Sequence, residues 1–233
     1  MFYSSSYFIY MIPAIVLVML AQFWVQSAYR RWSRVENSLS ISGAQAAQRM
    51  LSEGSLYMVS LEGARGQLSD HYDPRSHTLR LSQAVAQGNS VASLAIAAHE
   101  IGHALQDKQD YFPLRLRAAI VPVVNIGSSL GYIFILVGLI LQGALGAQLA
   151  SVGLIAFSLG TVFALATVPI EINASTRALK LLKESGLITS QKEQRGVKAV
   201  LNAAAFTYIA ALAASLLQLL YWASLVMGGR RRR

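Results

Sequence analysis

Residues 118–170 carry no charged side chain, and this run constrains the fold more than any other feature of the sequence. A helix crosses the apolar core of a bilayer in about 20 residues, so the run is too long for one crossing and suits two. Residues 1–29 and 199–227 are also uncharged. Charged residues make up only 13% of the chain, whereas soluble domains carry roughly 25%. The sequence therefore predicts a mainly α, polytopic membrane protein with about four transmembrane helices.

The predicted spans divide the chain into five parts. Residues 1–29 form an N-terminal transmembrane helix with aromatic residues at both ends, typical of a membrane interface. This segment lacks the basic start and the small-residue cleavage site of a signal peptide. The remaining parts are a polar domain at 30–117, a transmembrane hairpin at 118–170, polar helices at 171–198, and a fourth transmembrane helix with a basic tail at 199–233. Within the hairpin we expect helices at 118–142 and 148–168, with a tight turn at 143–146.

The basic residues predict which segments face the cytoplasm. Of the twenty Lys and Arg residues, ten lie within 30–117, six within 177–198 and four within 230–233. Cytoplasmic segments are enriched in Lys and Arg, so the two polar segments are predicted to be cytoplasmic, and the N-terminus and the hairpin turn external. Four spans would place the basic tail outside, against this rule. The basic residues flank apolar segments and form no single nucleic-acid-binding face, so the bilayer, with its anionic lipids, is their expected partner.

The polar domain is predicted to combine short helices with strands. Ser42 begins a capping box that opens a short helix. Residues 56–61 are a candidate strand, and residues 68–82 a hairpin with its turn at 70–74. The second strand of this hairpin, residues 77–82, alternates with period two and is a candidate edge for holding an extended peptide. An ordinary edge strand packed against the neighbouring helix is the alternative.

The motif His99-Glu100-Ile101-Gly102-His103 lies in a helix-compatible run that Asn89 or Ser90 caps and that reaches Lys108. Two histidines four residues apart lie on one face of a helix. Both can then reach one metal ion at about 2.0–2.1 Å. Glu100 has the position of a general base beside a metal-bound water. The alternative is a solvated helix with two incidental histidines, although the chain has only four histidines in all.

A catalytic zinc has three protein ligands and one open position for water, so one further ligand must come from elsewhere. The sequence contains no cysteine. Glu171 is the strongest candidate, because a carboxylate directly after a long apolar run is costly unless it is used. We expect Glu171 to begin a polar helix, with Ser175 one turn later placed to hydrogen-bond a ligand. The alternative is a Glu that only interacts with the helix dipole. The other candidates are His71, His77, Asp107 and Asp110.

Four side chains are candidates for supporting roles in catalysis. His71 lies on the predicted hairpin and is a candidate catalytic residue that polarises a peptide carbonyl. The alternative is that it only hydrogen-bonds within the turn. Asp107 follows His103 by one turn, and a solvated acid at the helix end is favoured over support of a ligand. Tyr72 and Arg177 are weaker candidates for stabilising an oxyanion.

Taken together, four segments resemble the YugP-like family of neutral membrane zinc metallopeptidases; they are residues 70–74 with 79–82, 97–106, 168–175 and 201–208. That family is similar to the gluzincins, in which a Glu on a later helix completes an HExxH site. The resemblance implies Zn²⁺ held by His99, His103 and Glu171, with Glu100 as the base, in a small α+β zincin-like catalytic domain. It also implies an integral protein of the bacterial inner membrane. Ser175 departs from the pattern, since many gluzincins place an Asp there.

These observations predict a membrane-embedded zinc metalloendopeptidase that hydrolyses peptide bonds at the cytoplasmic membrane face. Proteins or peptides, membrane proteins included, are the expected substrates, and nucleic acids are not. An intramembrane protease is disfavoured, because polar residues flank the motif helix and its apolar part is too short to cross a bilayer. A catalytically silent, metal-stabilised membrane scaffold or adaptor is the other alternative. The intact Glu100 argues against it, since a structural metal site has no need of a base.

Overall fold

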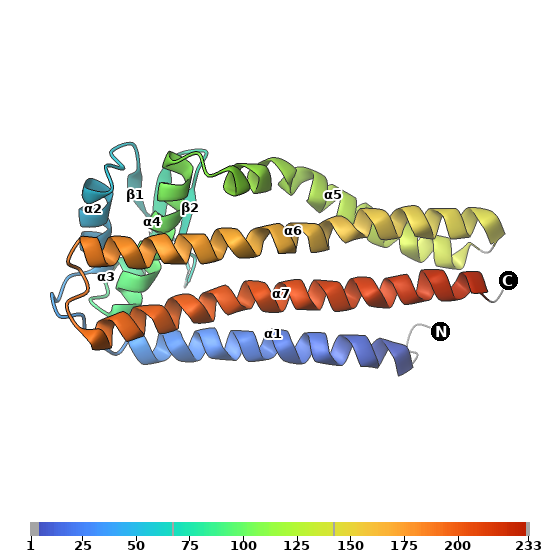
Figure 1. Cartoon of the computed structure of the whole chain (residues 1–233), viewed down its shortest axis with the longest axis horizontal. Coiled ribbons are helices and arrows are strands. Elements are labelled where there is room, and N and C mark those ends of the chain that lie inside the picture. Colours follow the sequence, from blue (N-terminus) through green and yellow to red (C-terminus); the bar gives the residue numbers. More distant parts are fainter. Residues whose placement is uncertain (1–4, 67, 142, 232–233) are drawn as a thin grey trace. The chain divides into compact units, whose positions relative to one another are not determined.

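The computed structural model describes residues 5–66, 68–141 and 143–231. Helices dominate it, accompanied by one small sheet (Figure 1). The chain forms two compact units. The first takes in the described residues of Met1–Ala21, Leu116–Val168 and Thr207–Arg233, and the second takes in those of Gln22–Arg115 and Pro169–Phe206. The polar domain and the segment around Glu171, which the sequence separates widely, therefore belong to the same unit.

The elements follow one another along the chain in the order α1 (Ser5–Trp32), α2 (Gly43–Glu53), β1 (Ser60–Ala64), β2 (His71–Asp73), β3 (Thr78–Ser82), α3 (Gln83–Gln87), α4 (Val91–Lys108), α5 (Phe112–Ile140), α6 (Gly143–Glu184) and α7 (Gln191–Arg231). Among the described residues, α1, α5, α6 and α7 are long and apolar enough to cross a membrane. The prediction of a mainly α membrane protein with about four spans is confirmed.

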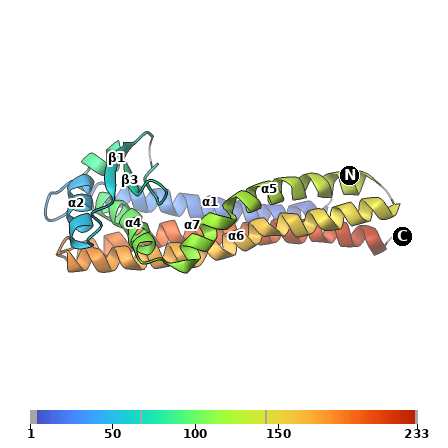
Figure 2. The ribbon, with the colours of Figure 1, turned by 90° about the horizontal axis from the view of Figure 1, so that it is seen from above.

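In the first unit, α5 and α6 lie side by side as an antiparallel hairpin (Figures 1 and 2). Glycines permit this contact. A Cβ atom on Gly131 would lie 2.5 Å from the backbone nitrogen of Phe157, and one on Gly138 would lie 2.4 Å from that of Ala150. Neither distance leaves room for a side chain. The small residues of the hairpin therefore serve close helix packing, as membrane helices commonly require.

Two predictions about α6 are wrong. The expected turn at 143–146 is the first turn of the helix, and the expected helix start at Glu171 lies deep inside it, because α6 continues through Pro169. A proline removes only one backbone hydrogen bond and crowds one preceding carbonyl. The turns on either side keep their bonds, and the fully buried Ile170 and Ala174 pack the helix just beyond the proline. Packing here outweighs the local tendency of proline to end a helix.

In the second unit, the sheet has the strand order β1-β3-β2. Strand β3 pairs in parallel with β1, with Thr78 opposite Ser60, and antiparallel with β2, with Leu79 opposite Tyr72. The prediction that residues 77–82 form an edge strand is therefore wrong. Strand β3 has a partner on both sides, and its Leu79 and Leu81 are fully buried. The edge beside the motif helix is β2.

The strand boundaries also differ from those expected. Residues 70–74 are not the hairpin turn, because His71–Asp73 form β2 and the chain reverses between Pro74 and His77. His77 has a left-handed φ of 47°, which suits a tight reversal. Only the last two residues of the candidate strand at 56–61 are strand, because β1 begins at Ser60. Pairing with β3 selects which residues become strand, and pairing partners are not visible in a local pattern.

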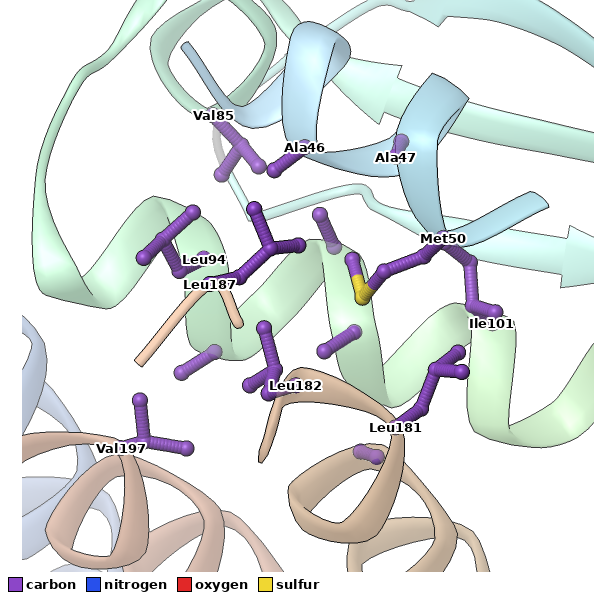
Figure 3. Packing of buried hydrophobic residues seen from close by; sticks show 14 of the residues in the cluster. Ala46, Ala47, Met50, Val85, Leu94, Ile101, Leu181, Leu182, Leu187 and Val197 are labelled. Carbon is purple, nitrogen blue, oxygen red and sulfur yellow. The ribbon is translucent and has the colours of Figure 1, made fainter. Parts of the chain in front are cut away.

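The hydrophobic core of the second unit surrounds α4. Figure 3 shows Met50 of α2, Leu94 and Ile101 of α4, Leu182 of α6 and Val197 of α7 converging from four helices. All five side chains are fully buried. A helix packed on this many sides has a fixed position and rotation, so the core determines where the opposite face of α4 points.

Candidate metal centre

Helix α4 carries His99, Glu100 and His103. As predicted, it begins after Ser90, whose hydroxyl accepts the backbone N–H of Ser93. The two imidazole rings are edge to face, with centroids 4.9 Å apart. Each histidine side chain is 13% exposed. The apolar face of the helix is in the core, and the two rings share the face that remains accessible.

Helix α6 brings Glu171 to these rings. Its Oε2 atom lies 3.2 Å from Nε2 of His99 and 3.4 Å from Nε2 of His103. The Glu171 side chain is only 3% exposed, and the residue lies well inside the helix. These facts exclude the alternative that Glu171 is a helix-start residue interacting with the dipole. A carboxylate buried this deeply must be compensated by positive charge.

The two helices meet at Gly102. A Cβ atom there would lie 2.3 Å from the carbonyl oxygen of Ala174 and 3.2 Å from its Cα atom. Backbone therefore lies directly against backbone, which only glycine allows. Gly102 lies next to His103, and Ala174 lies one turn after Glu171. The close approach thus brings the imidazoles and the carboxylate within reach of one another.

The geometry of these three side chains fits a zinc ion. Among the described residues, they are the group whose ligand atoms all lie within 4.8 Å of one another. Ligand atoms about 2.0–2.1 Å from a tetrahedral zinc are about 3.3–3.4 Å apart. The two nitrogen-to-oxygen distances, 3.2 and 3.4 Å, match that spacing. Two imidazoles and one carboxylate are also a donor set that zinc takes in catalytic sites.

A chain of hydrogen bonds fixes the proton on His103. Arg177 donates to Oδ1 of Asn173 at 2.6 Å, and a guanidinium can only donate. The same Oδ1 atom accepts from Nε2 of Gln106 at 2.9 Å, and this amide also donates to the carbonyl of Ile170 at 2.8 Å. The other end of the amide, Oε1, lies 3.0 Å from Nδ1 of His103 and must accept from it. Nδ1 therefore carries the proton.

With its proton on Nδ1, a neutral His103 presents a lone pair on Nε2 to the Glu171 carboxylate. Two acceptors facing each other repel unless a cation lies between them. Burial lowers the pKa of His103, but the hydrogen bond to Glu171 and the charge of Glu100 outweigh it, and the pKa of His103 is raised. A proton can thus supply the positive charge, and a metal ion bound by both atoms supplies it as well.

Ser175 lies beside His99, as predicted. Its hydroxyl is 3.2 Å from Nδ1 of the ring, so an Nδ1 proton can be donated to Ser175, leaving Nε2 to face Glu171. Histidine ligands of metals are commonly oriented in this way through the nitrogen that does not bind. Serine does this without a charge.

Glu100 lies on α4 between the two histidines of the centre and contacts the edge strand β2. Its Oε2 atom accepts the backbone N–H of Tyr72 in β2 at 3.1 Å. Burial raises the pKa of Glu100 above its ordinary value, against the opposing effect of the two neighbouring histidines. A carboxylate with a raised pKa accepts a proton more readily near neutral pH, which is what a general base requires.

The structure does not bring the other third-ligand candidates into this group. His71 is exposed, and its Nδ1 atom lies 2.8 Å from the carbonyl oxygen of Ser69. His77 lies 3.2 Å from Asp107, and Asp110 pairs with Arg115. The catalytic role of His71 stays a prediction.

Tyr72, Asp107 and Arg177 also have defined partners. The Tyr72 hydroxyl donates to Oδ2 of Asp107 at 2.8 Å, and burial together with this neighbouring charge raises the pKa of Tyr72. Asp107 is thus an acceptor for the edge strand rather than a solvated helix end. Arg177 donates to Asn173 and lies over the Tyr111 ring at 5.5 Å. The oxyanion roles of Tyr72 and Arg177 stay predictions.

The sequence patterns do not predict the roles of Gln106 and Asn173. Gln106 is completely buried, which is rare for an amide side chain without a special role. Its spacing was visible, since it follows His103 by three residues and so shares a face of the helix with it. Asn173 follows Glu171 by two residues, and no local pattern links it to Gln106.

We expect Gln106→Leu to weaken zinc binding about 10- to 100-fold, the usual effect of removing a group that orients a ligand. The substitution removes the acceptor for the His103 Nδ1 proton, so the ring is free to turn. Competition with a chromogenic chelator measures the affinity. Gln83→Leu is the matched control, because Gln83 is exposed in the same unit. Equal affinities for the two variants would contradict the role assigned to Gln106.

The fold and donor set describe a helical membrane protein with a candidate zinc centre, and the comparisons with known proteins place it in a family. Residues 7–227 match the family described as "Putative neutral zinc metallopeptidase", and the chain belongs to that family. It is 42% identical over 219 residues to the "Putative membrane protease YugP" of Bacillus subtilis (strain 168), an alignment that covers 94% of this chain and 96% of the relative. No solved structure matches the chain.

Proposed function

We propose that this protein is a zinc metalloendopeptidase that hydrolyses peptide bonds at the cytoplasmic face of the membrane. The observation that carries the proposal is the convergence of His99, His103 and Glu171 around one point, at distances suited to zinc. Membership in a zinc metallopeptidase family supports it, and so does a membrane-protease relative.

In this proposal, His99, His103 and Glu171 are the three zinc ligands. When bound, zinc supplies a Lewis acid that lowers the pKa of water and polarises a carbonyl group. Gln106 and Ser175 keep Nε2 of each imidazole directed at the centre. The Gly102 contact keeps the two helices close enough for all three side chains to meet.

Glu100 is the general base. Its carboxylate accepts a proton from the attacking water and then gives this proton to the departing amine of the substrate. Burial raises the pKa of Glu100, which makes its carboxylate a stronger base for the first of these steps. The backbone N–H of Tyr72 fixes one carboxylate oxygen at 3.1 Å, so Glu100 does not depend on the substrate for its orientation.

Strand β2 is the edge along which an extended peptide would bind. Among the described strands it pairs with β3 alone, and the N–H of its Tyr72 donates to Glu100. Proteins commonly hold peptides by adding them as a strand to an exposed sheet edge. Such a peptide would pass beside the base, and its backbone amide would be presented for cleavage.

Chelation tests the function. Purified protein in detergent is expected to cleave an unstructured protein such as casein, to lose this activity when zinc is removed with 1,10-phenanthroline, and to regain it when zinc is added. Appearance of new peptide termini, followed by mass spectrometry, is the measurement. Bound zinc without any cleavage would instead indicate the metal-stabilised scaffold.

The proposed membrane face is testable by cysteine labelling, because the chain contains no cysteine. Tyr57 is 80% exposed in the polar domain, and Leu145 is 70% exposed near the start of α6. In intact cells, a membrane-impermeant maleimide should label Leu145→Cys and spare Tyr57→Cys, and both should react after permeabilisation. Labelling of Tyr57→Cys in intact cells would place the site on the outer face.

A further inference from the structure

We propose that a pocket beside the candidate metal centre is a subsite that holds one bulky apolar or aromatic side chain of the substrate, within two residues of the scissile bond. This inference rests on the proposed peptidase function. The pocket has a volume of about 290 Å³. It lies between α4, the Tyr72 side chain and the loop that precedes β1, and it is formed within the second unit alone.

The size and lining of the pocket suit one apolar side chain. Ligand pockets span about 300–1,000 Å³, and this one, at about 290 Å³, lies just below that range and is too small for a folded segment. Leu56 and Ala104 are buried in its wall, and Val59 packs against the hydrophobic core. Met58, also part of the lining, is 83% exposed at the rim.

The charged residues that line the pocket already have partners. Lys108 donates to the carbonyl oxygens of Gly54 and Ser55 at 2.9 and 3.2 Å. Arg115 and Asp110 form an ion pair. The lining holds two carboxylates and two Lys or Arg side chains, so these charges balance. A charged occupant would therefore be desolvated without gaining a new partner, which is unfavourable, and a neutral side chain is preferred.

The remaining acid, Asp107, is held by the hairpin. Its Oδ2 atom accepts the Tyr72 hydroxyl at 2.8 Å and lies 3.2 Å from Nδ1 of His77. The pocket lining thus combines the polar groups of Tyr72, His77 and Asp107 with apolar side chains. An aromatic side chain fits such a lining, because its ring faces pack against apolar groups and its positively polarised edge tolerates polar ones.

Tyr72 connects the pocket to the reacting centre. Its side chain lines the pocket, and its backbone N–H contacts Glu100 at 3.1 Å. Asp107 follows His103 by four residues of α4, a rise of about 6 Å. An extended peptide advances about 3.2–3.4 Å per residue. A peptide lying along β2 with its scissile bond at Glu100 therefore places a side chain over the pocket within two residues.

A peptide library tests the inference. The wild-type protein in detergent, loaded with zinc, should cleave with a preference for bulky apolar residues at one fixed position, read by mass spectrometry of the products. Val59→Trp fills the pocket from its wall and should reduce kcat/KM for such peptides at least about tenfold. Peptides with alanine at that position should change less than about twofold.

Met58→Trp provides a second filling variant at the exposed rim and should shift the preference in the same direction. Tyr57→Trp is the control, because Tyr57 is exposed beside Met58 and does not line the pocket. Zinc content and thermal unfolding verify that each variant is folded. If the wild type cleaves nothing, the proposed function itself is wrong. If it cleaves without a preference, or if neither filling variant alters the preference, hydrolysis stands and the subsite is refuted.

Discussion

Glu100→Gln is expected to reduce peptide hydrolysis by about 10²- to 10⁴-fold, the usual contribution of a general acid-base group, while zinc stays bound. The amide has the size of the carboxylate and still accepts the Tyr72 N–H through its oxygen. It cannot take up a proton from water. Casein cleavage measured together with elemental analysis separates the two effects, because the proposed ligands, His99, His103 and Glu171, are untouched.

Glu53→Gln provides the control for this experiment. Glu53 is in the same unit, at the exposed end of α2, where it pairs with Arg49 at 3.0 Å. Its loss should leave both cleavage and zinc content unchanged, since surface ion pairs contribute little to stability. Undiminished cleavage by Glu100→Gln would show that Glu100 is not the general base. A simultaneous loss of zinc would mean that Glu100 supports the metal centre rather than the reaction.

The spacing of residues within α4 was enough to predict that His99 and His103 lie together. Two histidines four residues apart on a capped helix must share a face, so the sequence placed both imidazoles together before any fold was known. Glu171 was found by a different argument, the cost of a lone carboxylate at the end of an apolar run. That argument holds although its structural premise was wrong: Glu171 does not begin a helix but lies inside α6.

Contacts between distant segments were not predictable in the same way. Strand order follows from which strands bury their faces against α4 and each other, so β3 could not be recognised as the central strand from its period alone. The Gln106 contact with Asn173 joins residues 67 apart in the sequence. The contact of Gly102 with Ala174 is also long-range. For the last two contacts the missing information is the packing of α4 against α6, which a single sequence does not display.

Removing the carboxylate of Glu171 is expected to abolish zinc binding. The proposed site has three protein ligands, and Glu171 is the one that comes from α6. Glu171→Ala leaves His99 and His103 alone, while Glu171→Gln retains the size of the side chain and removes its charge. Elemental analysis of purified protein should show about one zinc per wild-type chain and close to none for either variant, with cleavage lost in parallel.

Glu184→Ala is the matched control, because Glu184 lies on the same helix, is 61% exposed and pairs only with Lys180 at 3.7 Å among the ion pairs described. Its zinc content should equal that of the wild type. Circular dichroism and gel filtration verify that Glu171→Gln remains folded, so that metal loss is not a consequence of unfolding. Full zinc retention by a folded Glu171→Gln would show that the carboxylate is only an ion-pair partner of His99 and His103. The 3.2 and 3.4 Å contacts would then describe a proton-mediated cluster, and a peptidase mechanism would need a third ligand from elsewhere.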